Sequence, residues 1–69
     1  MFKPMKRREY ERWIERFGWK LVKAGMDWKV IDAHGHIVIL NVIVTHPGGE
    51  IPPISIQKTK RTLKERGFL

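Results

Sequence analysis

The segment that decides the fold is residues 36–44, which reads HIVILNVIV. Almost every residue in it is β-branched or aliphatic, and that composition is typical of a β-strand. Side chains alternate between the two faces of a strand, so this segment is expected to be apolar on both faces. One face would carry Val38, Leu40, Val42 and Val44, and the other Ile37, Ile39, Asn41 and Ile43.

Two shorter strands are expected before this one, at residues 19–23 and 27–31. Trp19 and Leu21 would share one face of the first, and Trp28 and Val30 one face of the second. The stretch DAHG at residues 32–35 reads as a hairpin turn that ends in a glycine. The three segments therefore predict an antiparallel sheet joined by short turns.

Amphipathic helices are expected at residues 4–17 and 55–66, on either side of the strands in the sequence. The first has an apolar stripe at helical spacing, made of Tyr10, Trp13, Ile14 and Phe17. The second has a thinner stripe of Ile56, Thr59 and Leu63, and Ser55 is a suitable N-cap for it. We expect a single α+β domain over residues 1–69, with order α-β-β-β-α and both helices on one face of a three-stranded antiparallel sheet.

Length and composition limit the remaining possibilities. A chain of 69 residues that is 42% hydrophobic can build one small core. It has no cysteine, which fits a reducing compartment such as the cytoplasm. Its apolar runs are far shorter than the roughly 20 residues of a membrane helix, so no membrane span is expected. The motifs predict no cofactor and no metal site.

The net charge of +7 is concentrated at the two ends of the chain. Residues 1–23 carry eight basic and three acidic side chains, and residues 55–69 carry five basic and one acidic. A small basic domain of this kind usually binds a polyanion, most often nucleic acid. The predicted phosphate-binding residues are Lys20, Lys23, Lys58, Lys60, Arg61 and Lys64.

The order of the elements resembles the double-stranded RNA-binding domain, in which basic residues at the start of the last helix contact phosphates. Four stretches resemble the HicA-type mRNA interferase toxins, which share that fold. They are GWKLVKAG at residues 18–25, HGHIV at residues 34–38, THPGGE at residues 45–50 and LKERGFL at residues 63–69. The resemblance implies RNA as a ligand, with DNA as an alternative because phosphate contacts do not distinguish the two. It also implies a possible antitoxin-like protein partner.

The resemblance fails at the residue that carries the activity. Those toxins place a catalytic histidine after Gly-Ser, and here the matching run is GMDW, with Asp27 at that position. A carboxylate is a poor proton donor near neutral pH, so we expect weak or absent nuclease activity. The alternative is an active ribonuclease that uses His34, His36 or His46.

The last expectation concerns assembly. Two helices cover only one face of a sheet, so one apolar face would stay exposed, and monomers avoid large exposed apolar patches. We therefore expect a homodimer, or a protein partner, packed on the sheet. The predicted interface residues are Val22, Ile31, Ile37, Ile39 and Ile43.

Overall fold

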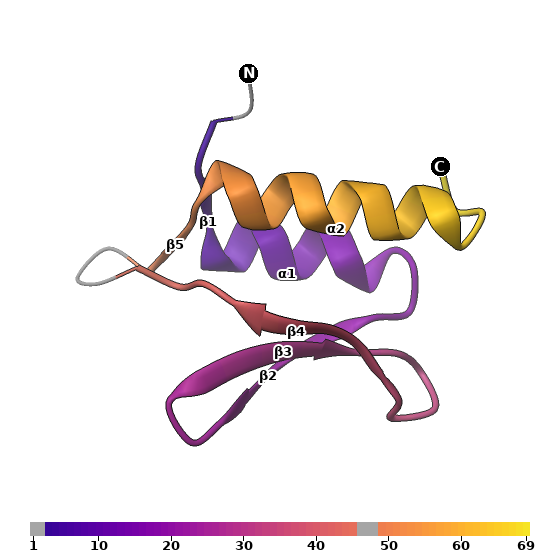
Figure 1. The fold of residues 1–69 in the computed structure, drawn as a ribbon, viewed down its shortest axis with the longest axis horizontal. Helices are drawn as coiled ribbons and strands as arrows, with labels where there is room; N and C mark the ends of the chain where they lie inside the picture. The colour runs from indigo at the N-terminus through magenta and orange to yellow at the C-terminus, as the bar shows by residue number, and fades with distance from the viewer. Residues whose placement is uncertain (1–2, 46–48) are drawn as a thin grey trace.

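The computed structural model describes residues 3–45 and 49–69. Within these residues the chain forms two helices and five strands (Figure 1). In chain order they are β1 (Met5–Lys6), α1 (Arg7–Glu15), β2 (Lys20–Ala24), β3 (Asp27–Ile31), β4 (Ile37–Val42), β5 (Glu50–Ile51) and α2 (Pro53–Glu65).

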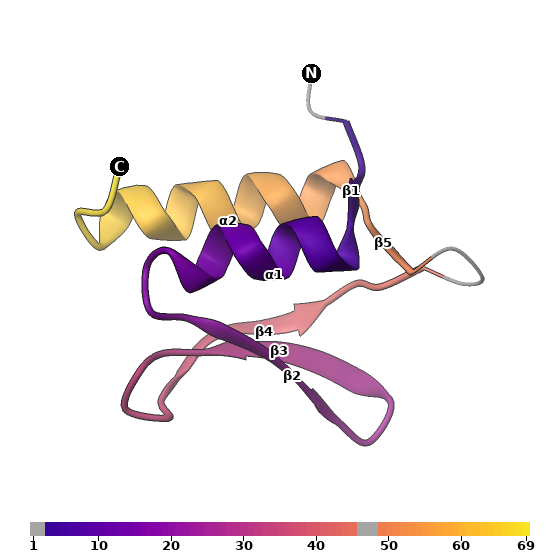
Figure 2. The same ribbon diagram turned by 180° about the vertical axis from the view of Figure 1, so that it is seen from behind.

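Strands β2, β3 and β4 form an antiparallel sheet in that order, and both helices lie on one face of it (Figure 1). Helix α1 packs against β2, and α2 packs against β4. Both helices begin at the same end of the molecule, as the view from behind also shows (Figure 2). The predicted α-β-β-β-α arrangement of an α+β fold is confirmed.

The core lies between the helical layer and the sheet. Its helical side consists of the predicted stripes, and its sheet side is built from inward-facing residues of the three long strands. The buried apolar residues are Tyr10, Ile14, Trp19, Leu21, Val30, Ile39, Val42, Ile51, Ile56 and Leu63. Trp13, Phe17 and Trp28 are partly buried and pack against this cluster. The tryptophans therefore act mainly as packing residues.

Strand β4 departs from the predicted alternation, and it is shorter than residues 36–44. Its pairing with β3 shifts register twice, so that Val30 faces Ile39 while Trp28 faces Val42. Each shift inserts an extra residue into β4, as in a β-bulge. Ile39 is consequently buried in the core, at 3% exposure, whereas Leu40 is 55% exposed. The prediction that Ile39 lies on the uncovered face was wrong, because simple alternation does not survive a bulge.

The first helix is shorter than predicted, because the chain before it pairs with another segment. Met5 pairs with Ile51 and Lys6 with Glu50, forming a small second sheet that joins the segment before α1 to the segment before α2. This pairing holds Met5 and Lys6 in extended conformation, so α1 begins at Arg7 and Pro4 lies outside it. Strand β2 covers residues 20–24 where 19–23 was predicted.

The second helix begins two residues earlier than predicted, with Pro53 as its first residue. Proline suits this position because its missing N–H group would have no partner in the first turn. Ser55 is therefore not an N-cap but a buried residue of the first turn. Its Oγ accepts a hydrogen bond from the backbone N–H of Ile43, at 3.3 Å, which ties α2 to the chain leaving β4.

Both helices end in the same kind of cap. Gly67 has a φ of 83°, and the N–H of Phe68 donates to the carbonyl of Leu63. This is a Schellman motif, in which glycine adopts the left-handed conformation. Phe68 then folds back to contact the rings of Phe17 and Trp19, at centroid distances of 5.5 and 5.7 Å.

Neither helix in the described part of the chain is long and apolar enough to cross a membrane.

Candidate nucleic-acid interface

Helix α2 presents a row of cations on the side opposite its buried stripe. Ile56, Thr59 and Leu63 face the core, and the helical repeat of 3.6 residues turns the cationic positions outward. Lys58, Arg61 and Lys64 are exposed on that side, and Lys60 is exposed at the border of the stripe, four residues after Ile56 and three before Leu63. The structure thus brings together four of the six predicted phosphate-binding residues on one helix.

One acidic residue of α2, Glu65, pairs with this surface. The Arg61 Nε lies 3.9 Å from a carboxylate oxygen of Glu65, and both side chains are largely exposed, so this ion pair is weak. The first turn of α2 carries no acidic residue. Two shallow hollows of about 460 Å³ each flank Arg61. Both hollows are lined by Gln57 and Arg61. The first is also lined by Ile54 and Lys58, and the second by Lys60, Lys64 and Leu69.

Helix α1 adds two cations that the predicted site did not include. Arg12 and Arg16 are exposed and line a hollow of about 290 Å³ together with Glu9 and the side chain of Trp13. Because α1 and α2 form one layer, these arginines belong to the same helical layer as the α2 cations (Figure 2). The spacing of four residues was the sequence signal for this row.

The remaining two predicted cations lie elsewhere. Lys20 pairs with Ile31 on the face of the sheet opposite the helices, which separates it from the α2 cations. Lys23 lies near the β2–β3 turn, with its Nζ 5.8 Å from the centre of the Trp28 ring. The guanidinium of Arg7 is 5.4 Å from the same ring. These cation–π contacts anchor the turn to the start of α1.

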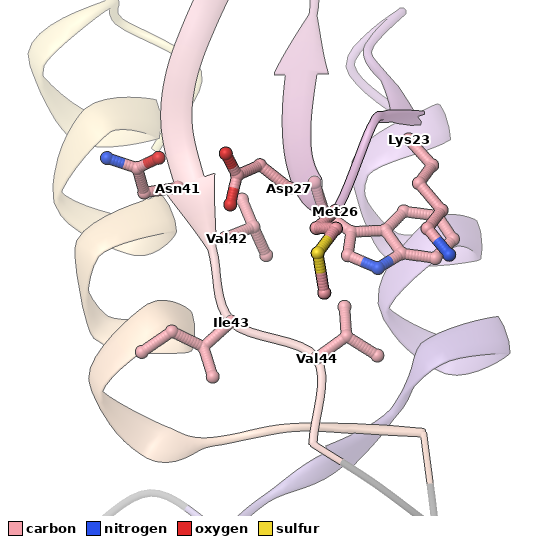
Figure 3. Close-up of a pocket in the computed structure, with 8 residues that line it drawn as sticks. Lys23, Met26, Asp27, Asn41, Val42, Ile43 and Val44 are labelled. Atoms are coloured by element: carbon pink, nitrogen blue, oxygen red, sulfur yellow. The ribbon is translucent and has the colours of Figure 1, made fainter.

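Asp27 occupies the first position of β3 and lines a hollow of about 400 Å³ between the β2–β3 turn and the chain around the end of β4 (Figure 3). Lys23, Met26 and Trp28 line it from the β2–β3 side, and the other wall is Asn41, Val42, Ile43 and Val44. Met26 is 95% exposed, so the hollow is open to solvent. Its lining is mostly apolar, with one carboxylate and one ammonium group.

His34 and His36 lie at the other end of β3, in the turn before β4. Oδ1 of Asp32 accepts hydrogen bonds from the backbone N–H groups of both histidines, each at 2.9 Å. These backbone bonds, with that from His36 first, lower the pKa of the Asp32 carboxyl group. The two rings are exposed, with centroids 6.3 Å apart.

His34 and His36 are therefore not in contact with Asp27. The length of β3 separates them, and a five-residue strand spans roughly 13 Å between its end residues. His46 lies outside the described residues. Within residues 3–45 and 49–69, no group of three or more histidine, aspartate or glutamate side chains could hold a metal ion.

Comparison of this chain with protein families, with curated proteins and with solved structures found no match.

Proposed function

We propose that this protein binds structured RNA through the cationic surface of α2, with Arg12 and Arg16 of α1 extending that surface. The observation that carries the proposal is the placement of three exposed cations, Lys58, Arg61 and Lys64, on the side of α2 away from its buried stripe, with exposed Lys60 at the border of that stripe. Lys58 and Lys64 are separated by about 9 Å along the helix axis. That distance suits contacts to phosphates along one strand and across a groove.

A duplex is favoured over a single strand because of where the aromatic rings lie. Proteins that bind single strands stack bases on exposed aromatic side chains. Among the described residues, Tyr10 and Trp19 are buried, and Trp13, Phe17 and Trp28 pack against the core. Phe68 is 46% exposed, but its ring contacts Phe17 and Trp19. The helical surface therefore offers mainly charge, with most aromatic rings engaged in packing. Such a surface contacts phosphates and gives little sequence preference.

The test compares two double charge reversals that change the net charge equally. Lys58→Glu with Arg61→Glu alters the proposed surface, and Lys20→Glu with Lys29→Glu alters the opposite face of the sheet. Binding is measured by fluorescence anisotropy with an RNA duplex, a DNA duplex of the same sequence and an RNA single strand. We expect the first variant to lose at least about tenfold in affinity and the second to stay close to the wild type.

Salt dependence gives an independent measure of the contacts. Three phosphate contacts predict that the logarithm of the binding constant falls by about two to three units per tenfold rise in salt. In the α2 variant, which removes two of the three contacts, the slope of the logarithm of the binding constant against the logarithm of salt should fall to that expected for about one contact. Equal binding by both charge-reversal variants would remove α2 from the site, and tighter binding of the DNA duplex would make DNA the ligand.

We propose that RNA cleavage by this protein is weak or absent. The support is the separation of Asp27 from His34 and His36, which leaves no described histidine near the position where the resembling toxins carry theirs. Incubation of the purified protein with labelled RNA should leave the RNA intact over hours. Robust cleavage that is lost in His34→Ala or His46→Ala would replace this proposal with a ribonuclease.

A further inference from the structure

Strand β2 presents a straight outer edge. It pairs with β3 along all five residues without a register shift, and within residues 3–45 and 49–69 no strand pairs with its other side. The opposite edge of the sheet is different, because β4 contains two register shifts and a left-handed residue at Asn41. Bulges protect an edge from pairing with another chain, whereas a regular edge is a template for it.

The backbone groups that β2 offers follow from its turn. Gly25 has a φ of 66° and is the first of two turn residues, so Ala24 and Asp27 form the closing, hydrogen-bonded pair. Antiparallel pairs alternate between hydrogen-bonded and non-hydrogen-bonded. The N–H and C=O groups of Leu21 and Lys23 therefore point away from β3. In the described part of the chain no hydrogen bond reaches them from that side.

We propose that a second copy of this chain pairs antiparallel with this edge, about a two-fold axis at Val22. In this register Leu21 of each copy faces Lys23 of the other, and the two pairs exchange four backbone hydrogen bonds. Val22 faces Val22 of the second copy as a non-hydrogen-bonded pair, in which side chains come closest. The interface is isologous, as in most soluble homodimers.

The side chains suit this register. Lys20 faces Ala24 of the second copy, and Lys23 faces Leu21, so no lysine faces another lysine across the interface. Like charges directly opposite each other would destabilise the pairing. Val22 lies on the face of the sheet away from the helices, opposite Lys29 of β3, and Ile31 is two residues further along β3 on the same face. The central contact of the proposed dimer is therefore apolar.

The charges on helix α1 are also complementary to those on α1 of the second copy. Arg7 contacts Trp28 of the sheet, and Tyr10 contacts α2, so the flank of α1 toward the β2 edge is the one that carries Arg8 and Glu15. Both side chains are exposed. The two-fold axis makes the α1 helices antiparallel, and this brings Arg8 of each copy toward Glu15 of the other.

The dimer would form a continuous six-stranded sheet with all four helices on one side. If the proposed RNA-binding function holds, the two α2 surfaces would then act on one long duplex. The pairing itself does not depend on that function. Because the interface is small, we expect a dissociation constant in the micromolar range.

The first experiment compares two lysine substitutions on the same face of the sheet. Sedimentation equilibrium of the full chain at increasing concentration should show a mass rising from 8.2 kDa toward twice that value. Val22→Lys places two ammonium groups at the two-fold axis and should weaken the dimer at least about tenfold, which is 1.4 kcal/mol. Ile37→Lys adds the same charge on β4, away from the axis, and should leave the dimer intact.

The second experiment separates backbone pairing from side-chain effects. Lys23→Pro removes an outward N–H group, which an edge strand tolerates, and should give a monomer. Lys23→Ala keeps the N–H group and should remain a dimer. Circular dichroism confirms the fold of each variant.

The third experiment tests the helix contact. Arg8→Glu should weaken the dimer, and adding Glu15→Arg should restore it. A wild-type mass of one chain at several hundred micromolar would overturn the proposal, and so would a folded Val22→Lys variant that dimerises as well as the wild type.

Discussion

The hydroxyl oxygen of Tyr10 lies 2.7 Å from Oγ1 of Thr59, so a buried hydrogen bond joins the two helices. The direction of this bond follows from the contact that Thr59 makes inside its own helix. The Thr59 hydroxyl donates to the carbonyl oxygen of Ser55, at 2.8 Å, and a threonine hydroxyl has only one proton to donate. Tyr10 is therefore the donor to Thr59. Burial raises the pKa of Tyr10, so it keeps this proton near neutral pH.

A double-mutant cycle at Tyr10 and Thr59 should measure this link. Tyr10→Phe removes the donor and should lower the free energy of unfolding by about 1 kcal/mol. Thr59→Val leaves the Tyr10 hydroxyl buried without its acceptor and should cost about 1–3 kcal/mol. The double variant should cost less than the sum of the two. Urea unfolding followed by tryptophan fluorescence gives the three values, and strict additivity would show that the contact contributes nothing.

The turn before β4 should lose stability in acid because of Asp32. The backbone N–H groups of His36 and His34 hold the pKa of this carboxyl group below its usual value of about 4. A lowered pKa in the folded state contributes stability above the unfolded pKa, and this contribution disappears as the pH falls through the folded value. Below about pH 4 the wild type should therefore lose part of its free energy of unfolding. The Asp32→Asn variant, which has no carboxyl group at this position, should not lose that part.

Urea unfolding of both proteins at pH 6 and pH 3 provides the measurement. Other carboxylates titrate in both proteins, so the quantity of interest is the difference between wild type and variant at each pH. That difference should shrink in acid. A constant difference would mean that the Asp32 charge does not support the turn.

Sequence periodicity predicted the two helices well, because each helix buries a single apolar stripe. The stripe of Tyr10 and Ile14 on α1, and that of Ile56 and Leu63 on α2, are buried as the spacing of three and four residues required. Pairing between β1 and β5 could not be predicted in this way. Each of these strands has only two residues, which is too few to show a periodic pattern, and the two strands are far apart in the sequence. The bulges of β4 also arise from its packing, since its sequence alone fits an uninterrupted strand.

The candidate site was predicted to a similar extent. The sequence pattern of α2 indicated which cations leave the core, because the apolar stripe fixes the opposite face. Lys20 and Lys23 could not be assigned to the same surface, since strand residues of opposite parity lie on opposite faces of the sheet. Arg12 and Arg16 lie four residues apart on α1 but were not predicted as part of the site, because their relation to α2 depends on how the two helices share a layer.

Because of the bulges, alanine substitution of two isoleucines that are two residues apart should lower the stability by very different amounts. Ile39 is 3% exposed and faces Val30 in the core, whereas Ile37 is 49% exposed and faces Ile31 on the uncovered face. Ile39→Ala should lower the free energy of unfolding by about 2–5 kcal/mol. Ile37→Ala should cost less than about 1 kcal/mol. Thermal unfolding by circular dichroism distinguishes them, and similar losses at both positions would contradict the described register.

Asn41 should tolerate glycine but not a β-branched residue. Its φ is 56°, in the left-handed region, where side chains other than those of asparagine and aspartate are strained. Asn41→Gly relieves strain but adds entropy to the unfolded chain, so its stability should stay within about 0.5 kcal/mol of the wild type. Asn41→Val should lose about 1–2 kcal/mol, because valine adopts this conformation poorly.

A matched control separates backbone strain from a general effect of valine at this bulge. Leu40→Val introduces the same side chain at the neighbouring residue, which is exposed and has no positive φ. Exposed positions without special geometry usually change stability by less than about 0.5 kcal/mol. If Asn41→Val is as stable as Leu40→Val, the left-handed residue does not hold the bulge. If it is less stable, the conformation of Asn41 is what keeps Ile39 and Val42 both in the core.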